Sequence, residues 1–195
     1  MKLASLAFLF LSFSALSSAQ SGELSVTLGE SLFKDNKLGS ISATDSSAQY
    51  KVGDGFRIGA RFTFNTRKLL GYEFGYAYSL SKLGLTGSPD VSMPTHQGFL
   101  NALFYFTPEG MRIRPFVAGG VHFTTFVPPG ASATYGTGTT KFGVNYGAGI
   151  KARVSSKYMV RVDLRDYITK KPFDLIGASG PLHQVEASVG FGIFF

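Results

Sequence analysis

From residue 20 to its end, the chain alternates large apolar residues with small or polar ones, and no helical periodicity is sustained. A period of two is typical of a β-strand whose two faces meet different surroundings. The segment 69–80 shows it most clearly, because Gly71, Glu73 and Gly75 separate aromatic and aliphatic residues. The pattern therefore predicts an all-β protein. We expect about eight strands, at about 22–33, 55–65, 69–80, 96–107, 112–125, 140–154, 157–168 and 182–195.

The connections between these segments alternate between long and short. The short ones, 65–68, 107–111 and 155–157, have the composition of hairpin turns. The long ones are rich in Gly, Ser, Thr and Pro, and they fall near 34–54, 81–95, 126–139 and 169–181. Short turns at one end and long loops at the other are typical of a transmembrane β-barrel, with the short turns in the periplasm. Both termini are then expected on the periplasmic side.

Alternation alone also fits a soluble sandwich or a soluble barrel that binds an apolar ligand in the periplasm. The composition of the two faces separates these alternatives. One face carries nearly unbroken aromatic and aliphatic side chains, whereas the other combines charged residues with many glycines and alanines. Large apolar residues outside and small or charged residues inside match a barrel surrounded by lipid. We therefore predict a closed, antiparallel, up-and-down transmembrane β-barrel.

Nine charged residues fall on the face predicted to line the interior. They are Arg57, Arg61, Glu73, Lys151, Arg153, Arg161, Asp163, Arg165 and Glu186. Eight strands enclose a space that side chains roughly fill, and unpaired charges there would be costly. We expect ion pairs and trapped water that largely plug the barrel. The alternative is a narrow pore, which the excess of basic groups would make anion-preferring.

The first nineteen residues have the features of a secretory signal peptide. Lys2 precedes an apolar stretch from Leu3 to Leu16, and small residues lead up to Gln20. We expect residues 1–19 to be removed on export and residues 20–195 to form one domain. The sequence contains no cysteine, so neither a lipoprotein anchor nor a disulfide is expected.

Other functional classes receive little support from the sequence. The net charge is +7, but the basic residues are scattered singly, so nucleic-acid binding is not expected. His96 and His183 are predicted to point outward and His122 inward, which does not make a metal site. A lipid A-modifying enzyme would need an activated serine, and the nearest arrangement is His122 with Thr124 on the same face, with Glu186 and Ser188 on another strand. We expect no catalytic residue, cofactor or metal.

Several segments carry a resemblance to a known family. Residues 114–120, 145–149, 162–167 and 190–195 resemble the later strands of small outer-membrane β-barrels, such as the transmembrane domain of outer-membrane protein A. The resemblance implies an integral protein in the outer membrane of a Gram-negative, or diderm, bacterium. It also implies that the barrel assembly machinery recognises the last strand, which ends in the alternating residues Val189, Phe191, Ile193 and Phe195.

The resemblance marks an architecture and leaves the activity open. Full-length outer-membrane protein A has a periplasmic peptidoglycan-binding domain that this sequence lacks, so a cell-wall tether is not implied. We expect a monomer, surrounded by outer-membrane lipid and lipopolysaccharide. Its expected role is structural, or the presentation of surface-exposed loops. The narrow anion-preferring pore, the lipid A-modifying enzyme and the soluble ligand-binding barrel are the alternatives.

Overall fold

The computed structural model describes residues 21–40, 49–130, 138–173, 175–177 and 179–195, so the predicted signal peptide lies outside the described residues. The regular structure in this part of the chain is all β. The strands are β1 (Ser21–Lys34), β2 (Lys37–Gly39), β3 (Tyr50–Arg67), β4 (Leu70–Leu85), β5 (Val91–Tyr105), β6 (Ile113–Phe126), β7 (Thr139–Arg153), β8 (Tyr158–Lys170) and β9 (Pro181–Phe194). None of the described residues belongs to a helix that could cross a membrane.

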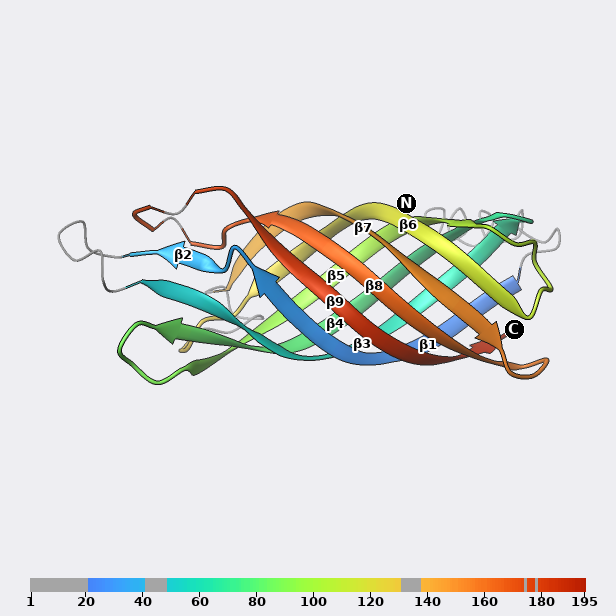
Figure 1. Ribbon diagram of the computed structural model, residues 1–195, viewed down its shortest axis with the longest axis horizontal. Helices are drawn as coiled ribbons and strands as arrows, with labels where there is room; N and C mark the ends of the chain where they lie inside the picture. The colour runs from blue at the N-terminus through green and yellow to red at the C-terminus, as the bar shows by residue number, and fades with distance from the viewer. Residues whose placement is uncertain (1–20, 41–48, 131–137, 174, 178) are drawn as a thin grey trace, which may run out of the picture.

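The long strands form one closed antiparallel barrel (Figure 1). Consecutive strands from β3 to β9 pair with each other. β1 closes the sheet by pairing with both β3 and β9. At the seam, Leu24 lies opposite Phe62 on one side and Ile193 on the other. Closure removes the sheet edges, whose unpaired backbone groups could not be satisfied in lipid. The predicted fold class is confirmed.

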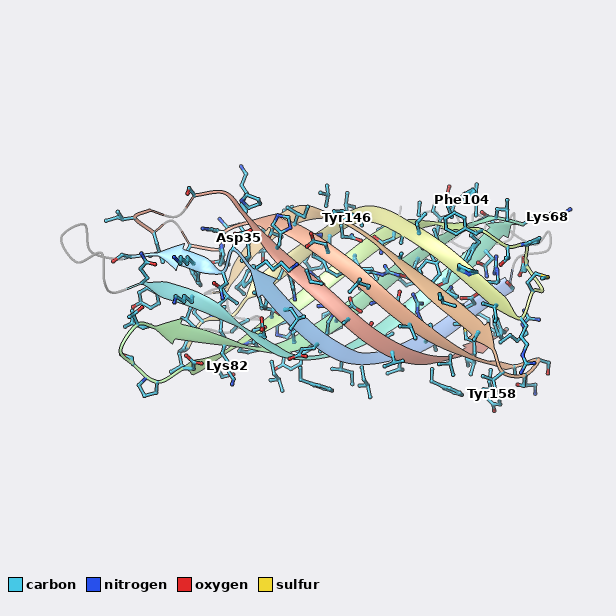
Figure 2. All side chains as sticks on the ribbon, viewed as in Figure 1. Asp35, Lys68, Lys82, Phe104, Tyr146 and Tyr158 are labelled. Atoms are coloured by element: carbon cyan, nitrogen blue, oxygen red, sulfur yellow. The ribbon has the colours of Figure 1, made fainter. Side chains whose placement is uncertain are left out.

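The two faces of the barrel are arranged as predicted. Apolar side chains cover the outer wall, and Val162, for example, is 54% exposed. Figure 2 shows the labelled Phe104, Tyr146 and Tyr158 on this outer surface, pointing away from the barrel. The interior holds the charged residues, and Arg61 is 1% and Glu73 0% exposed. An apolar exterior over a polar core suits lipid, and it excludes the soluble ligand-binding alternative.

Both ends of the described chain lie at the short-turn end of the barrel. β1 begins and β9 ends at the barrel end that carries the short turns (Figure 1). There the backbone amide of Gly22 donates to the carbonyl of Phe195, and the amide of Phe195 donates to the carbonyl of Gly22, both at 2.9 Å. The final residues of the predicted assembly signal therefore belong to the seam that closes the barrel.

The predicted long loop at 81–95 is wrong. β4 continues to Leu85 and β5 starts at Val91, so that a short turn replaces most of that loop. The strands extend because the alternation continues: Val52, Leu83 and Met93 point inward and are buried. Gly84 and Pro94 are residues typical of loops, but the burial of the alternating residues around them favours a strand. β3 likewise begins at Tyr50, within the predicted loop 34–54.

These extended strands enclose an apolar cluster at the long-loop end, which we call the apolar cap. Its buried members are Phe33, Leu38, Val52, Leu83, Met93, Phe126 and Leu182. Phe173 and Leu175, from the predicted loop 169–181, pack against it. Ser40 and Ile176 exchange two backbone hydrogen bonds of 2.9 Å, which tie this loop to the end of β2. The cap gives the long-loop end of the barrel a packed core of its own.

Candidate functional site

The charged interior is the candidate site, and strand alternation positions its side chains. Arg161, Asp163 and Arg165 occupy successive inward positions of β8, while Val162 between two of them faces outward. Inward positions of β3, β4 and β9 supply the other predicted members of the central cluster, which are Arg57, Arg61, Glu73 and Glu186. The structure therefore brings seven of the predicted interior residues into one buried cluster.

Glu73 is the centre of the middle layer of this cluster. Its carboxylate lies 2.8 Å from Nη1 of Arg161, 2.8 Å from Nη2 of Arg165 and 3.3 Å from Nη1 of Arg61. It also accepts a 3.2 Å hydrogen bond from the hydroxyl of Thr63. Three guanidinium groups converge on one buried carboxylate. Glu73 therefore compensates positive charge from β3 and from β8, two strands that are far apart in the sequence.

Asp163 supplies the second carboxylate of the middle layer. Arg161 donates to both of its oxygens, from Nε at 2.7 Å and from Nη2 at 2.8 Å. Nη2 of Arg165 donates to Oδ1 at 2.9 Å. The two-point contact from Arg161 fixes the guanidinium plane, as is typical of paired arginine and carboxylate groups.

Glu186 organises the layer nearer the apolar cap. Arg57 Nε lies 3.1 Å from its Oε2, and Arg61 contacts its Oε1. The hydroxyls of Tyr167 and Ser188 donate to the same carboxylate at 3.0 and 2.5 Å. Neutral hydrogen bonds extend this layer, since the Gln97 amide donates to Thr124 at 2.9 Å and to Gln184 at 3.2 Å.

The layer nearer the short turns contains two residues that the sequence analysis missed. Glu23 forms an ion pair with Lys151 and lies 4.0 Å from Arg114. Lys151 also donates to the Tyr105 hydroxyl at 2.8 Å. Alternation could have identified both residues, because Glu23 precedes the outward Leu24 and Arg114 follows the outward Ile113.

Arg153, the remaining predicted interior residue, lies apart from these ion pairs. It is half-buried, and its guanidinium carbon lies 4.6 Å from the centre of the Phe194 ring. Within the described residues it contacts no carboxylate closely enough to form an ion pair. Arg153 therefore stays outside the buried ion pairs, because β7 ends at this residue, beyond the layer that holds Glu23.

The interior network is closer to neutral than the sequence analysis predicted. The buried ion pairs of the described residues join six basic side chains to four carboxylates. Aromatic rings compensate part of the remaining positive charge, since Arg61 lies 4.9 Å from the Phe99 ring and Arg57 5.1 Å from the Tyr167 ring. These contacts fill the middle of the barrel.

Small residues opposite the rings make this packing feasible. A Cβ on Gly149 would lie 2.5 Å from Cζ of Phe116 and 2.6 Å from the carbonyl oxygen of Val162. Gly149 lies within strand β7. Its role is to admit an interior aromatic ring.

We expect Gly149→Val to lower the free energy of unfolding in lipid vesicles by about 1–3 kcal/mol, because the side chain would overpack the interior. Gly119→Val is the matched control, since a Cβ there meets only the Asn145 carbonyl oxygen at 3.9 Å on the outer wall. Urea titration followed by the heat-modifiable gel band measures both. Equal losses for the two variants would contradict this account of Gly149.

The three histidines face as predicted, with His122 inward and His96 and His183 outward. His96 contacts the Tyr76 hydroxyl at 2.5 Å, and His183 contacts Asp166 at 2.7 Å. His122 packs edge-on against Tyr167, with ring centres 5.1 Å apart. Among the described residues, no three His, Cys, Asp or Glu side chains form a group that could hold a metal ion.

The candidate catalytic arrangement also does not assemble. The Ser188 hydroxyl donates to Glu186, and the Thr124 hydroxyl accepts from Gln97. Neither ring nitrogen of His122 has a hydrogen-bond partner in the described part of the chain. His122 therefore activates neither hydroxyl in this arrangement.

Comparison with known proteins agrees with this architecture. Residues 3–195 match the family model described as the outer membrane protein beta-barrel domain. The solved structure of OprG from Pseudomonas aeruginosa is similar at a TM-score of 0.67 and 14% identity, covering 91% of this chain and 96% of that one. Neisserial surface protein A is similar at a TM-score of 0.57 and 11% identity, covering 91% and 98%. The N-terminal β-barrel domain of Pseudomonas aeruginosa OprF is similar at 0.55 and 14%, covering 90% and 97%.

No curated protein sequence matches the chain. At such low identities, the solved structures show the fold alone. The family match spans nearly the whole sequence and agrees with the apolar outer wall and the closed sheet. The chain therefore belongs to the outer membrane protein β-barrel domain family, and it is an integral β-barrel of the outer membrane.

Proposed function

We propose that this protein is a sealed barrel that holds an extension of strands and loops at the cell surface. The observation that carries the proposal is the buried ion-pair network, in which Arg61, Glu73 and Arg161 are at most 1% exposed. A chain that conducted ions would need a wet path past these groups. The network instead joins opposite walls of the barrel through direct side-chain contacts.

Both ends of the barrel support a sealed interior. At the long-loop end, the apolar cap lies above the polar layers. At the short-turn end, Glu23, Arg114 and Arg153 border a cavity of about 10 Å³. That volume is about what one water molecule requires, so it offers no route for a solute.

A narrow anion-preferring pore is the second candidate. The six basic and four acidic side chains of the buried network favour it, because the excess charge would attract anions. The alternative needs transient separation of ion pairs such as Arg161 with Glu73. Conduction measurements distinguish the two functions directly.

In a planar lipid bilayer, we expect the wild-type barrel to give no stepwise conductance, because the buried ion pairs of the middle layer fill the interior. Insertion is verified beforehand by the heat-modifiable band of reconstituted vesicles. A general porin in the same bilayer is the positive control. Conductance steps whose reversal potential in a salt gradient indicates anion preference would contradict the sealed-barrel proposal and support the pore. Steps without ion preference would contradict both.

The proposed role is structural and recognition-based, without catalysis. The extension formed by β2 and the outer parts of β3, β4 and β5 reaches beyond the barrel at the long-loop end (Figure 1). Loops on rigid scaffolds commonly carry recognition. Along the barrel wall the long strands pair on both sides, which leaves no edge there for strand addition between copies and supports a monomer. Recognition of Val189, Phe191, Ile193 and Phe195 by the barrel assembly machinery stays a prediction.

A further inference from the structure

Basic residues from two neighbouring strands border the interior at the short-turn end of the barrel, where β6 begins and β7 ends (Figure 1). Arg114 and Lys151 are directly opposite each other in the ladder between these strands. One step further out, the Arg153 backbone amide donates to the Arg112 carbonyl at 2.7 Å, so these two residues also lie side by side. Like charges at opposite positions of neighbouring strands destabilise a sheet. Two such pairs in succession therefore require compensation by negative charge.

Glu23 is the carboxylate that the interior supplies at this level. It forms an ion pair with Lys151 and lies 4.0 Å from Nη1 of Arg114. Within the described residues, neither Arg112 nor Arg153 forms an ion pair. Four basic side chains therefore share one carboxylate, and positive charge remains in excess.

Two other carboxylates at the short-turn end are engaged elsewhere. Glu109, in the turn before β6, accepts from the hydroxyl of Ser21. The terminal carbonyl of Phe195 accepts from the backbone amide of Gly22 at 2.9 Å. Neither carboxylate forms an ion pair with a basic side chain in the part of the chain that the structure describes. They leave the excess charge between β6 and β7 uncompensated.

Two of the arginines also keep an N–H group without an acceptor. The Nε atoms of Arg114 and Arg153 are buried and have no hydrogen-bond partner among the described residues. Arg114 is 5% exposed, and besides the 4.0 Å approach to Glu23 its Nη2 donates to the Lys68 carbonyl at 3.4 Å. Its guanidinium carbon lies 3.7 Å from the centre of the Tyr105 ring, which compensates part of its charge. A buried donor without an acceptor is costly, so both Nε groups indicate an acceptor that the described chain does not provide.

Both arginines border the cavity of about 10 Å³ at this end, which we call the mouth cavity. Arg112 and Lys151 line it as well. Its volume admits one particle of about the size of a water molecule. A monatomic anion meets this limit, whereas a phosphate or carboxylate group carries several oxygen atoms. Because Arg112 and Met111 are exposed, an ion can reach the cavity from the periplasm.

We propose that the mouth cavity binds one small anion, chloride, between Arg112, Arg114 and Arg153. The Nε–H groups of Arg114 and Arg153 donate to the ion, and its charge offsets the excess of basic side chains between β6 and β7. Arginine suits this role, because its guanidinium group has five donors, no acceptor and a permanent charge. The site lies at one mouth of the barrel and needs no path through the interior, so its test is independent of whether the barrel conducts ions.

The test titrates chloride into the full barrel, refolded in a zwitterionic detergent, and follows urea unfolding by the heat-modifiable gel band. Gluconate, a bulky monovalent anion, keeps the ionic strength constant, so that general screening of the exposed charges does not change. The site variant combines Arg112→Gln with Arg153→Gln. The control combines Lys68→Gln with Lys157→Gln, which remove the same charge from exposed positions in other short turns, outside the cavity (Figure 2 shows Lys68). The gel band also verifies that both variants fold.

Broadening of the chloride NMR line by the folded barrel measures binding separately from stability and gives the dissociation constant. We expect chloride at ten times that constant to raise the wild-type folding equilibrium constant about tenfold. The control should match wild type within about twofold, and the site variant should neither respond to chloride nor broaden the line. Equal responses of the two variants, or no difference between chloride and gluconate for wild type, would overturn the site. Equal stabilisation by phosphate would overturn the small anion as its ligand.

Discussion

Glu73→Ala should lower the free energy of unfolding in lipid vesicles by about 3–5 kcal/mol, the scale of breaking a buried ion pair from one side. The variant leaves Arg61, Arg161 and Arg165 facing one another with one carboxylate fewer. Glu73→Gln retains the shape and should lose nearly as much, because the missing negative charge dominates. Urea unfolding followed by the heat-modifiable band measures each loss.

Glu30→Ala is the control for the loss of a carboxylate. Glu30 lies on β1, is exposed on the outer wall and forms no ion pair within the described residues. Its removal should change stability by less than about 0.5 kcal/mol. A Glu73 variant as stable as the Glu30 variant would mean that the interior charges are compensated by water, and the sealed-barrel proposal would lose its main support.

Val162→Arg should destabilise the barrel by about 2–4 kcal/mol in a bilayer, because the side chain would enter the hydrocarbon near its midplane. Val162 lies midway along β8 between Tyr158 and Asp166, and its neighbours Ile150 and Val189 also face outward. Val91→Arg, on the extension beyond the barrel, should cost less than about 1 kcal/mol. Vesicle unfolding of the two variants at equal lipid concentration makes the comparison.

A similar cost at both positions would place the extension inside the hydrocarbon. A negligible cost at Val162 would mean that this part of the outer wall does not contact lipid. The pair therefore measures where along the barrel the membrane ends.

Alternation was sufficient to predict which residues point inward. Arg61 and Glu73 follow from their apolar neighbours on β3 and β4, because a strand cannot present adjacent residues to one face. The same rule applies to Glu23 and Arg114, and applying it through both strands would have included them. Which face a strand residue takes depends only on its position relative to its sequence neighbours, so it can be predicted from the local sequence.

The pairing of the charges could not be predicted in the same way. Arg61 lies beside Glu186, far away in sequence, because the tilt of the strands brings β3 and β9 inward positions to one level. That tilt depends on the stagger around the entire closed sheet. β7 and β8 pair up to Gly143 and Thr169, and where that pairing ends is likewise a property of the assembled barrel, for which the local sequence of either strand contains no signal.

The extension shows where composition misleads. Gly84 and Pro94 indicate a loop, but Leu83 and Met93 are inward residues of the apolar cap. Burial of these side chains compensates for a poor local strand propensity. Following the alternation of apolar and polar residues past Gly84 would have predicted the extended hairpin.

The ion pairs of the interior connect strands that the chain makes early with strands that it makes late. Lys151 of β7 neutralises Glu23 of β1, and Glu186 of β9 neutralises Arg61 of β3. Before the last strand docks, an open sheet exposes these charges without their partners, and lipid would reject it. We therefore expect neutralisation of the interior and closure of the seam to occur together, with no stable half-inserted sheet.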